Sequence, residues 1–174
     1  MSSLIKNDRK VTARHFHSTK RFIDDLCAVN DGGEFGKSFP DIYPQELELK
    51  VEHSGDRASF LNLDIHIQDG MFIYHLYDKR DDFPFFIVRM PHRDSNIPDS
   101  IFYSALVGEF LRIGRSTLLL QDFVPKANSL VERMLRQGAQ EWAVKKHLKK
   151  IIFKHPDCFQ KFQILPNELV SKVM

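Results

Sequence analysis

The chain has 174 residues, of which 43% are hydrophobic and 28% charged, proportions close to those of ordinary globular domains. This composition excludes a disordered tail or a fibrous repeat, and the length favours one domain, or one and a fraction. The N-terminus lacks the apolar core of a secretory signal, and no apolar run reaches the roughly 18 residues that a membrane span needs. With only two cysteines, these features predict an intracellular protein, nuclear or cytoplasmic, with no membrane partner.

The net charge of +2 is unevenly distributed along the chain. Residues 1–20 carry five basic side chains and one acidic one, residues 21–124 carry ten and eighteen, and residues 125–174 carry ten and four. An acidic centre between basic ends is what a cation-binding site beside a polyanion-binding surface needs. An ordinary domain is equally compatible with this distribution, because the halves of such domains often differ by several charges.

The first expected elements lie near the N-terminus. Residues 1–20 are polar and are expected to be irregular. From residue 21 to 30, two short apolar stretches flank Asp24-Asp25, which predicts a strand, a tight turn and a second strand. Residues 34–43 predict a short helix or a loop that ends before Pro44.

The clearest signal is an alternation of apolar and polar residues, which predicts strands with one face in solvent. The alternating stretches are 46–52, 61–68 and 72–76. Asp69-Gly70, between the last two, is typical of a type I′ hairpin turn. We therefore expect an antiparallel meander, after which residues 83–90 form either another strand or a packed loop.

From about residue 99 the period becomes helical. Residues 101–118 predict one or two helices, and Ser129 predicts the cap of another helix that ends near Gly138. A further amphipathic helix follows from apolar residues that share one face, Val144, Leu148, Ile151 and Ile152. Strands followed by helices predict an α+β fold, with antiparallel hairpins and a meander before a helical bundle.

The Asp24-Asp25 pair has two interpretations. Carboxylates at the tip of a hairpin suit Mg²⁺, which takes one or two carboxylates together with phosphate oxygens, and polymerases hold two such ions. Neighbouring residues of a regular strand, however, point to opposite faces, so both carboxylates reach one site only if the turn redirects one of them. The pair could also be ordinary turn residues, and Asp81-Asp82 shows the same dipeptide.

The wider context of the pair is more specific. Residues 21–25, Arg-Phe-Ile-Asp-Asp, resemble the aromatic-x-Asp-Asp motif of reverse transcriptases, with Phe22 where Tyr is commoner. Later stretches resemble the Penelope-like retroelement branch in their order and spacing: 41–44, 46–49, 58–65, 77–85, 95–98 and Gln137-Gly138. The resemblance covers about residues 20–140. It implies an irregular segment over 1–20, a partial palm over 21–98 and a helical thumb-like region over 99–174.

The resemblance also implies roles for particular residues. Asp24 would bind Mg²⁺ or Mn²⁺ directly, and Asp25 would be the second catalytic carboxylate of the motif. Residues 46–52 resemble the strand that closes the palm near the incoming dNTP. The stretch that resembles the primer grip is Phe60, Leu61, Asn62 and Leu63, with Asn62 where Asp is frequent. The side chains expected to meet phosphates of an RNA template–DNA primer duplex are Arg112, Arg115, Lys145, Lys146, Lys149 and Lys150.

A palm polymerase needs a further metal-binding carboxylate from a strand well before the Asp-Asp hairpin, and Asp8 is the only acid that precedes Asp24 here. We therefore expect a C-terminal part of an RNA-directed DNA polymerase, which lacks an N-terminal half and is inactive by itself because the transferring phosphoryl group is poorly neutralised. The alternatives are a non-catalytic nucleic-acid-binding module derived from the thumb and a poorly folded pseudogene product.

Trp142 and Phe153 are expected in the core. Base stacking would require them to be exposed beside basic groups.

Overall fold

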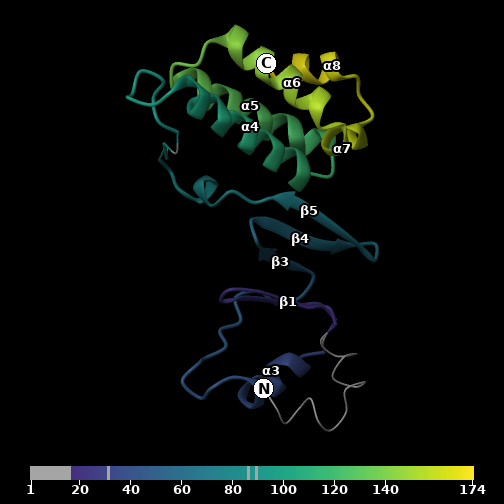
Figure 1. Cartoon of the computed structure of the whole chain (residues 1–174). Coiled ribbons are helices and arrows are strands. Elements are labelled where there is room, and N and C mark those ends of the chain that lie inside the picture. The colour runs from purple at the N-terminus through teal and green to yellow at the C-terminus, as the bar shows by residue number, and fades with distance from the viewer. Residues whose placement is uncertain (1–16, 31, 86, 89) are drawn as a thin grey trace. The chain divides into compact units, whose positions relative to one another are not determined.

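The computed structural model describes residues 17–30, 32–85, 87–88 and 90–174 (Figure 1). Within these ranges, six helices and two small sheets with strand orders β1-β2 and β3-β4-β5 form an α+β fold, which confirms the predicted class. The chain divides into two compact units, residues 1–61 and 62–174. The boundaries that the resemblance places near residues 20 and 98 stay a prediction. No helix in the described ranges is long and apolar enough to cross a membrane.

The first unit contains the expected N-terminal hairpin and short helix. β1 (Thr19–Phe22) and β2 (Asp25–Ala28) pair antiparallel, with Phe22 opposite Asp25. Most of the segment expected to be irregular lies outside the described residues, but its last two residues belong to β1, so the prediction is wrong at that end. Helix α3 (Glu34–Ile42) follows and buries Phe35 and Phe39. Phe39 also stacks on Tyr43, with ring centroids 4.6 Å apart.

The prediction of a strand over residues 46–52 is wrong. Residues 47–54 form neither helix nor strand, and Leu47 and Val51 are 54% and 69% exposed. A strand with alternating side chains is stable only where a neighbouring strand takes its backbone hydrogen bonds and a surface covers its apolar face. The described residues provide neither for this stretch. β3 (Arg57–Phe60) is the next strand of the chain.

The second unit begins with the best-predicted hairpin. β4 (Leu63–Gln68) and β5 (Met71–Leu76) pair antiparallel, from Leu63 opposite Leu76 to Gln68 opposite Met71. The turn residues Asp69 and Gly70 have φ values of 51° and 73°, which confirms the predicted type I′ turn. A 3-10 turn, η1 (Lys79–Asp82), follows β5. The described residues between 83 and 90 form a loop and not a strand, which agrees with the second of the two predicted alternatives.

Helices make up the rest of the second unit. They are α4 (Asp99–Ser116), α5 (Leu120–Arg136), α6 (Glu141–Lys154), α7 (Pro156–Phe159) and α8 (Pro166–Val173), with a 3-10 turn η2 (Gln160–Phe162) after α7. The helix expected to start after Ser129 begins at Leu120, because buried Phe123 and Ala127 extend its apolar face toward the N-terminus. That burial outweighs the helical hydrogen bond lost at Pro125.

The end of α5 confirms the predicted stop near Gly138. Gly138 has a φ of 86° and donates its N–H to the Leu135 carbonyl at 3.0 Å. Ala139 donates its N–H to the Met134 carbonyl, also at 3.0 Å. This pair of hydrogen bonds is a Schellman motif, which requires the left-handed conformation that glycine adopts without strain.

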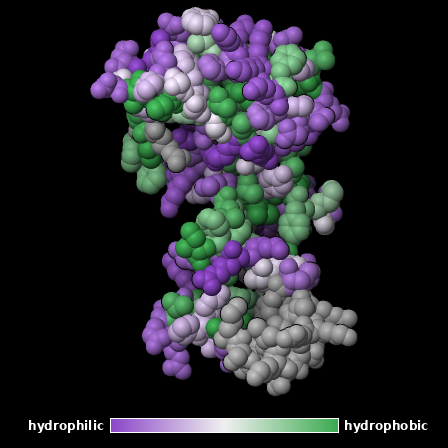
Figure 2. Space-filling model, in the orientation of Figure 1, coloured by the Kyte–Doolittle hydropathy of each residue, from purple (hydrophilic) through white to green (hydrophobic). Residues whose placement is uncertain are grey.

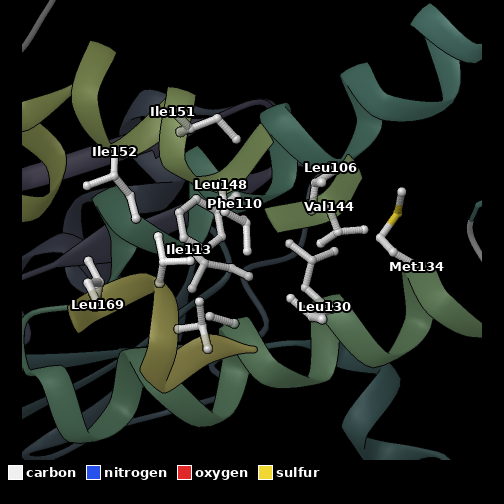
Figure 3. Close-up of a cluster of buried hydrophobic side chains, with 14 of the residues drawn as sticks. Leu106, Phe110, Ile113, Leu130, Met134, Val144, Leu148, Ile151, Ile152 and Leu169 are labelled. Atoms are coloured by element: carbon white, nitrogen blue, oxygen red, sulfur yellow. The ribbon is translucent and has the colours of Figure 1, made fainter. Parts of the chain in front are cut away.

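The core of the second unit lies between its helices. Figure 3 shows side chains from α4, α5, α6 and α8 that point toward one another. Phe110, Phe123, Phe159 and Phe162 add a cluster of aromatic rings with centroids 4.8 to 5.9 Å apart. Each fully buried large apolar side chain contributes about 1.5–3 kcal/mol relative to exposure, so this interior stabilises the helical arrangement.

Polar contacts attach the segment after β4 to the helices. His75 of β5 lies 3.0 Å from the Asp122 carboxylate of α5, measured from ring Nδ1 to Oδ2. Arg80 pairs with Asp78 and lies 3.5 Å from Glu109 of α4. The hydrogen bond from Arg80 lowers the pKa of Asp78 to about 2, so this ion cluster stays charged through the neutral range.

Two glycines of α4 provide a test of this packing. A Cβ at Gly114 would lie 2.7 Å from the buried Phe159 ring, whereas a Cβ at Gly108 would meet nothing within 4 Å. We predict that Gly114→Ala destabilises the fold by about 1–3 kcal/mol through overpacking. Gly108→Ala stabilises it by up to about 1 kcal/mol through helix propensity. Urea unfolding measures both, and equal effects of the two substitutions would contradict the described α4–α7 packing.

Candidate metal hairpin and nucleic-acid interface

The Asp24-Asp25 pair lies at the tip of the β1–β2 hairpin. β1 ends at Phe22 and β2 begins at Asp25, so Ile23 and Asp24 form the turn. Both aspartates are exposed. Because Asp24 belongs to the turn and Asp25 to the strand, the opposite-face rule for neighbouring strand residues does not separate their carboxylates.

The backbone of this turn is strained. Ile23 has a φ of 54° and is 73% exposed. Positive φ is uncommon for any residue with a side chain and is an outlier for a β-branched one, because the Cβ clashes with the backbone. Arg21 braces the turn by donating from Nε to the Ile23 carbonyl at 2.9 Å. The two-residue hairpin turn requires positive φ, and Ile23, which faces solvent, occupies a position that Gly, Asn or Asp normally takes.

The hairpin tip fits one side of a magnesium site. Mg²⁺ in phosphoryl-transfer sites takes one or two carboxylates and completes its shell with phosphates and water. Two exposed adjacent aspartates match that donor set. The described residues contain no cluster of three or more metal-ligating side chains, so the hairpin is not a complete protein cage.

The residues that resemble the primer grip also form a hairpin tip. Phe60 ends β3 and Leu63 begins β4, while Leu61 and Asn62 have φ values of 51° and 63°. Two successive positive φ values make a tight turn of the type I′ class. The strand predicted from residue 61 therefore starts two residues later. Leu61 is 42% exposed at this tip.

The four predicted lysines of α6, Lys145, Lys146, Lys149 and Lys150, are all exposed. Among the described residues, no ion pair involves them, so their charges remain available to a polyanion. Burial lowers the pKa of His147, with smaller contributions from the positive charges of Lys150 and Lys146. This helix therefore presents uncompensated positive charge on its solvent side.

The two predicted arginines of α4 differ from each other. Arg112 donates two hydrogen bonds to the Glu109 carboxylate, at 2.9 and 2.7 Å. This contact lowers the pKa of Glu109 and raises the pKa of Arg112. The charge of Arg112 is thus compensated within the protein, whereas Arg115 is exposed in the last turn of α4. Of the predicted phosphate-binding residues, those of α6 are the best placed to act together.

The expectation that Trp142 and Phe153 belong to the core is wrong. They are 65% and 63% exposed and lie on the same helix as the four lysines. The helical spacing already indicated that both residues are exposed, because they fall on the side of α6 opposite the buried Val144 and Leu148. Figure 2 shows that hydrophilic side chains predominate on the visible surface over the helices.

Comparisons with protein-family models, curated proteins and solved structures found no match to this chain. Function is therefore inferred from the chain's own residues and from the resemblance of its motifs.

The α6 lysines provide a test of the interface. Each Lys→Ala substitution at 145, 146, 149 or 150 should weaken binding to a template–primer duplex. It should also reduce the slope of log affinity against log salt by about one, because one fewer counterion is released. Lys172→Ala, at an exposed lysine of α8, is the matched control and should leave the slope unchanged. Equal slopes for the α6 variants and the control would exclude α6 as the contact surface.

Proposed function

We propose that this chain is the C-terminal part of a reverse transcriptase similar to those of Penelope-like retroelements, contributing the end of the palm and the thumb. The observation that carries the proposal is the exposed, strained Asp24-Asp25 hairpin tip within the aromatic-x-Asp-Asp motif. A two-residue hairpin turn requires positive φ, but Gly, Asn or Asp normally takes that position, and Ile23 there marks a strained backbone of the kind that concentrates at functional sites.

In the intact enzyme, Asp24 holds a divalent cation, Mg²⁺ or Mn²⁺, and Asp25 supplies the second carboxylate. The metal contributes neutralisation of the charge on the transferring phosphoryl group. The contribution of the hairpin is to mount two negative charges at an exposed and braced turn, where the phosphates of a dNTP and a primer end have access. Arg21, which donates to the Ile23 carbonyl, keeps that turn in place.

The remaining matched residues position the nucleic acid. The turn formed by Phe60, Leu61, Asn62 and Leu63 acts at the 3′ end of the primer. The α6 lysines contact phosphates along the RNA template–DNA primer duplex, and the non-directional attraction of lysine for phosphate suits contacts that carry no sequence information. Nucleic acid and dNTP are thus the proposed partners.

The proposal assigns the other metal-binding carboxylate and the fingers to a polypeptide segment outside this sequence. Asp24 and Asp25 provide one side of the metal clamp, and loss of the other side removes the electrostatic stabilisation on which phosphoryl transfer depends. The helical unit by itself also supports the alternative of a binding module without chemistry, because its uncompensated lysines need no metal site to bind phosphates. Its close-packed interior argues against a product that fails to fold.

Primer extension on an RNA template, with Mg²⁺ or Mn²⁺, tests the catalytic part of the proposal. We expect no extension above background by this chain, and the same result for Asp24→Ala, because the metal clamp is incomplete. Extension by the unmodified chain that is abolished by Asp24→Ala would show that these residues suffice for catalysis. That result would overturn the assignment of a missing carboxylate.

A further inference from the structure

One face of α6 combines exposed aromatic rings with lysines. Trp142, Lys146, Lys149 and Phe153 follow one another at spacings of four, three and four residues, which places them on a single line along a helix. Lys145 and Lys150 flank this line. We call these six residues the α6 aromatic–lysine face. The opposite side of the helix is buried against α4, α5 and α8.

The two rings of this face are exposed despite their size. Trp142 and Phe153 are about two-thirds exposed, although the same helix buries smaller apolar residues such as Val144 completely. Large exposed aromatic side chains beside polar ones often mark a contact surface. Glu141, at the first position of α6, is the one acidic residue of this helix, so positive charge predominates on this face.

The chemistry of the face selects among possible ligands. Lysines attract phosphates, and aromatic rings stack on the flat faces of nucleobases. In a duplex the bases are already stacked and paired, so only an unpaired strand offers free base faces to Trp142 and Phe153. A lipid surface fits less well, because an interfacial helix inserts its apolar face, whereas the apolar face of α6 is already buried in the protein core.

We propose that the α6 aromatic–lysine face binds an unpaired strand of nucleic acid. Trp142 and Phe153 each stack on a base, and the lysines between and beside them contact the intervening phosphates. The two aromatic residues are eleven positions apart, which corresponds to about 16 Å along a helix axis. Stacked nucleotides of one duplex strand rise by only about 3.4 Å each along the helix axis, so the rings engage bases separated by intervening nucleotides. The proposal rests on the proposed function only in taking nucleic acid as the ligand.

The chain offers a direct reporter for this contact, because Trp142 is its single tryptophan. Titration of the full chain with a single-stranded oligo(dT) should quench the Trp142 fluorescence, whereas a blunt duplex should quench it little. Phe153→Ala, which retains the reporter, should weaken single-strand affinity about 5- to 150-fold, the loss expected for one stacked base. It should change duplex affinity less than about twofold.

Phe85→Ala is the matched control, since Phe85 is also 63% exposed but lies outside α6. It should change neither affinity. Lysine-dependent binding without quenching, or an equal loss for Phe85→Ala and Phe153→Ala, would overturn the stacking proposal and leave the proposed function intact. Failure to bind either nucleic acid at low salt would count against both. Stronger quenching by phosphatidylserine vesicles than by oligo(dT) would identify a membrane contact and also overturn the proposal.

Discussion

The burial of one apolar face of α6 is the interaction on which the rest of the second unit depends. Val144, Leu148, Ile151 and Ile152 are almost completely buried, and they pack with side chains of α4, α5 and α8 (Figure 3). Once this face is fixed, the rotation of the helix is fixed, and every remaining α6 residue has a determined exposure. The lysines and the two aromatic rings therefore face solvent as a consequence of core packing. The spacing of apolar residues in α6 therefore determines both the stability of the second unit and the position of the candidate interface.

In the first unit, the corresponding constraint is backbone conformation. Its hairpin tip buries little, and Ile23 adopts a positive φ that a β-branched residue normally avoids. Leu61, at the tip that resembles the primer grip, is a second large apolar residue with positive φ. Both outliers occur where the motif resemblance places function, and neither residue is buried. Both residues occupy tight hairpin turns that require positive φ, where Gly, Asn or Asp is the usual residue.

The sequence predicted those parts of the fold that are determined by residues close together in the chain. The Asp69-Gly70 turn and the α6 helix were predicted because two positive φ values and one apolar face are encoded within a few residues. The strand over 46–52 was predicted wrongly, because alternating residues form a strand only where another part of the chain pairs with the backbone and covers the apolar side chains. The start of α5 was missed because burial of Phe123 and Ala127 overrides Pro125. The hairpin around Asp24-Asp25 was predictable from the sequence, but the strain at Ile23 was not, since it arises from three-dimensional context. The exposure of Trp142 was encoded in the helical spacing and was missed because large aromatic residues are usually buried.

The central proposal is that the Asp24-Asp25 tip binds a divalent cation. Broadening of backbone amide NMR signals by substoichiometric Mn²⁺ tests it most directly, and Asp81-Asp82 serves as an internal control with the same dipeptide. The account predicts selective broadening of signals from residues 22–26, loss of this effect in Asp24→Asn, and no comparable effect at residues 81–82. Equal broadening at the two dipeptides, or broadening that survives Asp24→Asn, would contradict the claim.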